Sequence, residues 1–205
     1  RQHPQDYIDG TVEVVTNAIE KAIGTDRAFD AANIIGIGID TTGSTPIPVD
    51  RDGTPLGLLP AFQDNLNAMA WLWKDHTSHE EAARITEVAA ALRPQYLARC
   101  GGTYSSEWFW AKLWHCLNVA PHVFSTAYSF VEHCDYMPAL LAGNTESDKL
   151  VRGVCAAGHK AMYCEEWGGL PDSEFLNELD PALADLRGRL YDRALTADQP
   201  AGTLC

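Results

Sequence analysis

The sequence lacks the excess of basic residues that binding to a phosphate backbone or to an anionic membrane requires. Its 205 residues include 15 Lys and Arg against 28 Asp and Glu, which gives a formal net charge of −13. Clustered Lys and Arg supply much of the affinity for nucleic acids and for anionic lipid surfaces. We therefore expect neither nucleic acid nor a membrane as a partner, and expect a small molecule or another protein instead.

Long hydrophobic runs are also absent. No apolar stretch approaches the roughly 20 residues of a membrane-spanning helix. The first residues, RQHPQDYIDG, do not have the basic region followed by an apolar region of a secretion signal. These absences predict a cytoplasmic location.

The cysteines lack the spacing of a zinc ribbon or of a secreted disulfide framework. There are six, none of them in a C-x-x-C pair, and they are Cys100, Cys116, Cys134, Cys155, Cys164 and Cys205. The pattern predicts reduced thiols that lie mostly in the core.

No internal repeat or dividing linker is present, and 46% of the residues are hydrophobic. These features predict a single domain or one large lobe of a larger protein. The chain has no initiator Met and ends without a closing helix or a charged tail. We interpret it as a piece of a longer chain.

Apolar residues at helical spacing predict several helices. The predicted helices cover residues 6–23, 77–92, 105–117, 127–141 and 173–179, and a short further helix begins at Asp180-Pro181. The residues from Thr77 to Glu80 have the capping-box pattern, in which the Thr oxygen and the Glu side chain satisfy free backbone N–H groups. This pattern predicts the start of the second helix at Thr77.

Two segments have the composition of strands. The run from Asn33 to Ile39 is rich in β-branched Ile and predicts a strand buried on both faces. Residues 46–60 alternate apolar residues with turn signals and include Asp52-Gly53, which predicts a β-hairpin with a tight turn. A strand or a short helix is expected around Cys155. The fold class predicted is therefore α/β.

The glycines after the first predicted strand match no nucleotide-binding motif. Gly36, Gly38 and Gly43 have the spacing G-x-G-x(4)-G, which is neither the dinucleotide fingerprint nor the Lys-containing P-loop. The string DTTGS is similar to the aspartic protease signature, but an extra Thr intrudes and no second copy exists. From spacing alone, a strand-to-loop turn and a ligand-binding loop both remain open.

Metal-binding pairs are present but incomplete. His76 and His79 are three residues apart, and Cys155 is four residues from His159. Each pair could supply two ligands, whereas a structural zinc site needs four and a catalytic one three. We predict no metal site.

Two charged residues lie in apolar surroundings. Glu107 begins a Trp-rich segment, where it could either stabilise the helix N-terminus or contact a ligand. Lys160 lies in CAAGHKAMY among small and apolar residues. Because a buried ammonium needs a partner, either a hydroxylated ligand or a structural carboxylate is expected beside Lys160.

Taken together and in order, five strings closely resemble the bacterial L-ribulokinases, which belong to the FGGY family of carbohydrate kinases. The strings are GIGIDTTGSTPIPVD (36–50), LWKDHTSHEEA (72–82), GGTYSSEWFWAKLWH (101–115), CAAGHKAMY (155–163) and EEWGGLPDSEF (165–175). The resemblance implies a ribonuclease-H-like lobe of the actin and hexokinase ATPase superfamily, incomplete at its N-terminus and with a helix-rich insertion. Residues 1–205 would form one partial domain, most of the N-terminal sugar-binding lobe.

The resemblance also implies parts that this chain does not contain. An N-terminal hairpin with a phosphate loop and a C-terminal nucleotide lobe are expected elsewhere in the parent protein. The catalytic base, an Asp, is expected downstream of Cys205, so we predict no catalytic residue in this chain. The parent is expected to use ATP and Mg²⁺, and the chain alone is expected to bind neither and to be inactive.

The same resemblance assigns residues to L-ribulose. The backbone at Gly43 and the ammonium of Lys160 are the first candidates for substrate binding. Further candidates for lining or bracing the pocket are Thr42, Ser44, Trp73 and Glu107. The expected reaction is transfer of the ATP γ-phosphate to the 5-hydroxyl of L-ribulose, in arabinose breakdown.

Alternatives stay open at this stage. The parent could phosphorylate another ketopentose or a polyol, since sugar preference depends on a few hydrogen bonds. The chain could also be a non-catalytic sugar-binding or regulatory module that keeps only this lobe. A sheet edge left uncovered would favour self-association, for example as a homodimer.

Overall fold

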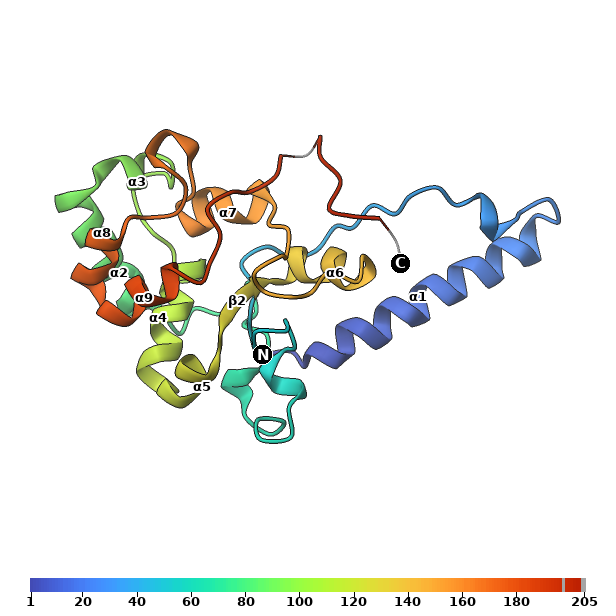
Figure 1. Ribbon diagram of the computed structural model, residues 1–205, viewed down its shortest axis with the longest axis horizontal. Helices are drawn as coiled ribbons and strands as arrows, with labels where there is room; N and C mark the ends of the chain where they lie inside the picture. The colour runs from blue at the N-terminus through green and yellow to red at the C-terminus, as the bar shows by residue number, and fades with distance from the viewer. Residues whose placement is uncertain (197, 204–205) are drawn as a thin grey trace.

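The structure is a computed structural model that describes residues 1–196 and 198–203. Figure 1 shows helices gathered on one side, a small sheet in the middle and one long helix that projects away. The helices are α1 (Pro4–Thr25), α2 (His79–Leu92), α3 (Pro94–Ala98), α4 (Phe109–Val119), α5 (Pro121–Thr126), α6 (His133–Leu141), α7 (Val154–Ala161), α8 (Ser173–Leu179) and α9 (Pro181–Arg187). We call residues 79–126 and 154–187 the helical body, and residues 4–40 the arm.

The sheet joins two segments that are distant in sequence. Strand β1 (Pro46–Val49) pairs antiparallel with β2 (Ser129–Glu132), with Pro46 opposite Glu132. Both strands are buried along their whole length. The sheet therefore ties the start of the chain to the helical body.

The predicted hairpin over residues 46–60 forms only in part. The turn is present, because Asp50 N–H donates to the Thr54 carbonyl and Gly53 has a φ of +81°. The returning chain makes one bridge, Val49 to Pro55, and then enters the 3-10 turn Leu56–Leu58. The prediction was wrong about the partner, since the main partner of β1 is β2.

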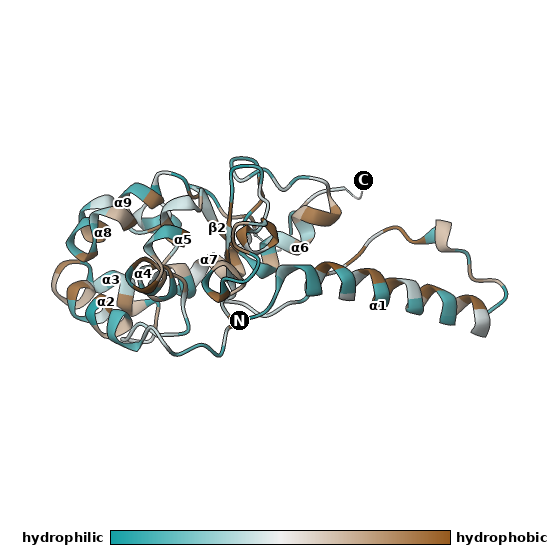
Figure 2. Cartoon of the chain, turned by 90° about the horizontal axis from the view of Figure 1, so that it is seen from below, coloured by the Kyte–Doolittle hydropathy of each residue, from teal (hydrophilic) through white to brown (hydrophobic). Residues whose placement is uncertain are grey.

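The predicted buried strand over residues 33–39 is wrong. Ala31–Asn33 is a 3-10 turn, and within the described part of the chain no strand pairs with residues 34–40. Ile35 is fully exposed. The β-branched composition is present, but a strand also needs a neighbouring strand for its backbone hydrogen bonds. Figure 2 shows hydrophobic residues along α1 and along the segment that returns beside it.

Most predicted helices are confirmed with shifted ends. Helix α1 matches its prediction, as do α8 and α9, and the segment around Cys155 is helical. The predicted helix 127–141 splits, because residues 129–132 pair with β1 and only residues 133–141 are helical. The capping box is wrong: Ser78 is the N-cap of α2, and the Thr77 hydroxyl donates to Asp75.

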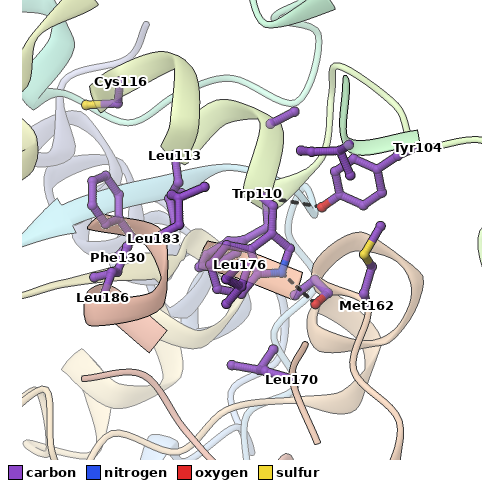
Figure 3. Packing of buried hydrophobic residues seen from close by; sticks show 14 of the residues in the cluster. Tyr104, Trp110, Leu113, Cys116, Phe130, Met162, Leu170, Leu176, Leu183 and Leu186 are labelled. Atoms are coloured by element: carbon purple, nitrogen blue, oxygen red, sulfur yellow. Dashed lines mark hydrogen bonds between the residues drawn. The ribbon is translucent and has the colours of Figure 1, made fainter. Parts of the chain in front are cut away.

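The main core lies between the helices of the body. Trp110 is fully buried at its centre, and Leu113, Leu176 and Leu183 pack around it (Figure 3). A smaller cluster, which includes Ile47, Val131 and Met137, joins the sheet to α6. None of the helices in the described residues is long and apolar enough to cross a membrane.

The thiols of Cys100, Cys116, Cys134, Cys155 and Cys164 are free, as predicted, but only two of these five are buried, so the prediction that the thiols lie mostly in the core is wrong. Their placement varies from the buried core (Cys100, Cys116) to the surface (Cys155). Cys205 lies outside the described residues.

Candidate functional site

The DTTGST loop ends at the first residue of β1, and its last residues are tightly held. Ser44 and Thr45 are buried, whereas Thr42 is exposed. The hydroxyls of Thr42 and Thr45 lie 3.1 Å apart. Ser44 has a φ of +63°, a left-handed conformation that is unfavourable for a residue other than glycine. The surrounding contacts must therefore stabilise this loop conformation.

Gly43 and Lys160 meet directly, although 117 residues separate them in sequence. A Cβ at Gly43 would collide with the Lys160 Nζ. Glycine therefore allows the ammonium to reach the loop backbone. Because Lys160 ends in a flexible chain, a small side chain at position 43 would require its ammonium to move aside.

Helix α7 carries Lys160 on a distorted last turn. Gly158 has a φ of −42° and a ψ of −114°, which kinks the helix. Met162 ends it in the left-handed conformation, with a φ of 55°. The kink leaves the carbonyls of the last turn free to accept hydrogen bonds from other parts of the body.

Side chains of the body hold this turn. The carbonyls of residues 159–162 each accept a hydrogen bond from a side chain. The donors, in order, are the Cys100 thiol, the Tyr104 hydroxyl, the Trp110 indole and the Trp167 indole. The Tyr104 oxygen also accepts from the Trp110 backbone N–H, at 3.0 Å (Figure 3). Aromatic residues of GGTYSSEWFW thus position Lys160.

A second lysine lies beneath the loop. Lys112 is 1% exposed, and its Nζ donates to the Ser44 carbonyl at 2.5 Å and to the Leu72 carbonyl at 2.7 Å. Burial lowers its pKa, and the nearby charges of Glu132 and Glu107 partly oppose that shift. Sequence reasoning missed Lys112. The signal was available, because the apolar run FWAKLWH leaves this lysine little access to water.

Glu132 contacts Thr45, the last residue of the loop. Its Oε2 accepts from the Thr45 N–H at 2.7 Å, and the His133 N–H donates to the Thr45 carbonyl at 3.0 Å. Burial raises the pKa of Glu132, and Asp135 adds to that rise, whereas the Thr45 N–H and the two lysines, Lys112 and Lys160, lower it. Sequence reasoning missed Glu132 as well, and no local pattern marks it.

The remaining predicted residues lie around this centre. Glu107 Oε1 is 3.2 Å from His76 Nε2, and its charge acts on Lys112. Trp73 follows Leu72 directly, is 40% exposed, and has the Lys74 ammonium 4.8 Å from its ring centroid. The structure therefore brings Gly43, Ser44 and Lys160 together and puts Glu107 within electrostatic range, whereas the ring of Trp73 is placed at the surface.

The histidine and cysteine pairs do not extend to metal sites. Within the described ranges 1–196 and 198–203, no group of three or more His, Cys, Asp or Glu residues could hold a metal ion.

An apolar groove lies apart from the Gly43 and Lys160 contact. It has a volume of about 710 Å³ between α1, residues 37–41 and α6. Tyr7, Val14, Ile39, His133 and Met137 are among the residues that line it. Gly43 and Lys160 do not line it, so we place the candidate polar site at the loop and not in this groove.

Comparison with solved structures identifies the class of fold. The chain aligns with a xylulose kinase from Brucella ovis over 100% of its length and 36% of that chain, with a TM-score of 0.67 and 18% identity. A xylulose kinase from Bifidobacterium adolescentis aligns over 76% of this chain and 34% of that chain, with a TM-score of 0.55 and 12% identity. The chain therefore shares the fold of about a third of each of these two xylulose kinase chains.

Comparison with curated sequences narrows this class. The chain is 49% identical over 205 residues to a ribulokinase from Vibrio parahaemolyticus, and 38% identical over 204 residues to one from Shouchella clausii. It is a homologue of the ribulokinases, which confirms the resemblance of the five strings. The matches cover 99–100% of this chain but only 34–35% of those two relatives, so the chain spans about a third of their length. No family model matches the chain.

Proposed function

We propose that this chain forms the sugar-binding side of an ATP-dependent kinase that phosphorylates the 5-hydroxyl of L-ribulose. The observation that carries the proposal is the contact of Lys160 with the Gly43 backbone, in a chain 49% identical to a ribulokinase. A ketopentose is uncharged and rich in hydroxyls, so its site needs directional donors and acceptors. An ammonium beside exposed loop backbone supplies both.

The chain's own residues would bind and orient the sugar. Lys160 would donate to a sugar oxygen, and the backbone at Gly43 would approach the sugar without a Cβ in the way. Lys112 and Glu132 would keep the loop in place. Phosphoryl transfer depends mainly on positioning and on neutralising charge, and ATP with Mg²⁺ would supply the transferred group and the neutralising cation when bound.

We also propose how the parts of the kinase are distributed along the parent protein. Residues 1–205 would be most of the N-terminal lobe, and the phosphate-loop hairpin, the nucleotide lobe and the catalytic Asp would lie elsewhere in the parent. The chain alone would then bind sugar without turnover.

The test is a comparison of substrates with the full-length parent protein. We expect ATP-dependent phosphorylation of L-ribulose with a kcat/KM at least about 10-fold above that for other ketopentoses, which corresponds to about 1.4 kcal/mol of differential binding. Absence of turnover with any sugar would contradict the kinase assignment. A clear preference for L-xylulose or D-xylulose would favour the alternative, a kinase for another ketopentose, which the xylulose kinase fold neighbours support.

A further inference from the structure

We propose that Glu132 is a positioning residue of the sugar site, which holds the Gly43–Thr45 backbone in place and supplies the buried negative charge that Lys112 and Lys160 share. This inference rests on the proposed function, because it assigns the loop to the sugar. Glu132 is not proposed to touch the sugar, since its side chain is buried beneath the loop.

The sheet register places Glu132 where it can act on the loop. As the last residue of β2, Glu132 lies opposite Pro46, the first residue of β1. Pro46 has no N–H to donate, so the backbone of Thr45 makes the next contacts. Its N–H donates to Glu132 Oε2 at 2.7 Å and its carbonyl accepts from His133 N–H at 3.0 Å. Both backbone groups of Thr45 are therefore fixed by two successive residues of β2 and α6.

The charges also converge on Glu132. The ammonium of Lys112 donates to two carbonyls, neither of which carries a full charge. The largest electrostatic interaction that stabilises this buried cation is with Glu132, and Glu107 comes second. Lys160 interacts with Glu132 as well. An acid that is 3% exposed and interacts with both lysines provides a counter-charge for the buried Lys112.

One oxygen of Glu132 has spare capacity. Oε1 is buried and has no hydrogen-bond partner among the described residues. A buried polar atom without a partner is costly, and a function can account for it. The Thr45 N–H uses only Oε2, so what Oε1 adds to this site is charge and not a hydrogen bond to the described residues.

Asp135 offers a matched control. It is also buried, at 7% exposed, and burial raises its pKa as it does for Glu132. Its Oδ1 accepts from the Gly153 N–H at 2.8 Å, and Arg152 is the charge that acts on it most. Asp135 thus has similar burial and chemistry but serves the 152–153 segment instead of the loop.

The first experiment compares Glu132→Gln with Asp135→Asn in the full-length protein. Gln keeps the shape and a neutral acceptor for Thr45, but it loses the charge. Because a hydrogen bond to a charged group is stronger than a neutral one, we expect the KM for L-ribulose to rise about 5-fold to 10-fold, with the KM for ATP changed less than about 2-fold. Asp135→Asn should leave both KM values within about 2-fold. Equal effects of the two substitutions on the sugar KM would overturn the proposal.

A second measurement does not depend on activity. Amide hydrogen exchange at Ser44 and Thr45 should be at least about 5-fold faster in Glu132→Gln than in the wild type, and unchanged in Asp135→Asn, since the charge-assisted bond to Thr45 is weakened. If exchange at Ser44 and Thr45 is the same in Glu132→Gln and in the wild type, Glu132 does not position the loop, whatever ligand the loop binds. If exchange is faster in Glu132→Gln as expected but the wild-type protein phosphorylates no sugar, only the proposed function is contradicted.

Discussion

The helical body and the arm contain similar apolar residues but place them in opposite environments. In the body, Trp110, Leu176 and Leu183 are completely buried. In the arm, Val14 is 68% exposed and Ile35 is fully exposed, and Pro4 is the buried residue of α1. A pattern of apolar residues therefore does not predict burial by itself, because burial also needs a partner surface within reach.

The largest expected difference comes from truncating one side chain in each region. Trp110→Ala removes a fully buried ring and the indole bond to Ala161 O, and it should lower the free energy of unfolding by about 3–5 kcal/mol. Val14→Ala in the arm should change it by less than about 0.5 kcal/mol. Urea unfolding of the chain followed by circular dichroism measures both.

If Trp110→Ala and Val14→Ala lower the free energy of unfolding by similar amounts, the body and the arm do not differ in packing as described. If Trp110→Ala does not fold, Trp110→Phe keeps most of the packing and loses the indole donor. We expect a cost of about 1–3 kcal/mol for this variant, because a buried carbonyl loses its partner.

The next effect concerns the buried acid at the junction of the two regions. The pKa of Glu132 is raised from 4.5 to about 7, mainly by burial. Between these values the unfolded chain loses this proton before the folded chain does, so the contribution of Glu132 to stability falls as the pH rises from about 4.5 to about 7. The loss should be on the order of 3 kcal/mol.

Unfolding at pH 5 and at pH 7.5 isolates this contribution. Asp135, with a raised pKa, and His133, with a lowered one, also titrate near this range. Both are present in the wild type and in Glu132→Gln, so the difference between the two proteins reports on Glu132. The wild type should lose more stability than the variant between the two pH values, and parallel losses would rule out a buried, titrating Glu132.

The smallest effect on stability is expected in the exposed segment of the arm. Ile35→Asp should change the free energy of unfolding by less than about 0.5 kcal/mol, because the side chain is fully exposed. The same substitution should reduce self-association of the chain in analytical ultracentrifugation, since it adds charge to a segment of exposed Ile side chains. A marked loss of stability would mean that the segment packs in solution.

The sequence predicts those elements whose signals are local. Helix α8 was predicted from apolar spacing and α9 from Asp180-Pro181, and in the structure Asp172 and Asp180 cap them by accepting from the Phe175 and Ala182 N–H groups. Residues 129–132 could not be assigned from spacing, because their strand depends on pairing with β1 far along the chain. The strand predicted over residues 33–39 is wrong for a related reason. Its composition is strand-like, but the described residues contain no partner strand for it.

The site divides in the same way. Lys160 was found as a lysine among apolar residues, and the same argument would have found Lys112 in FWAKLWH. The contact of Lys160 with Gly43 came from the resemblance and not from spacing, because no periodic pattern links residues so distant in sequence. Glu132 could not be predicted, since its role depends on which loop faces the end of β2.

The most direct test of the account is Lys160→Met in the full-length protein. Because the Lys160 ammonium is proposed to bind the sugar, the KM for L-ribulose should rise about 10-fold to 100-fold while the KM for ATP changes less than about 2-fold. An unchanged KM for the sugar, or an equal rise for both substrates, would contradict the central claim that the loop at Gly43 and the end of α7 form the sugar site.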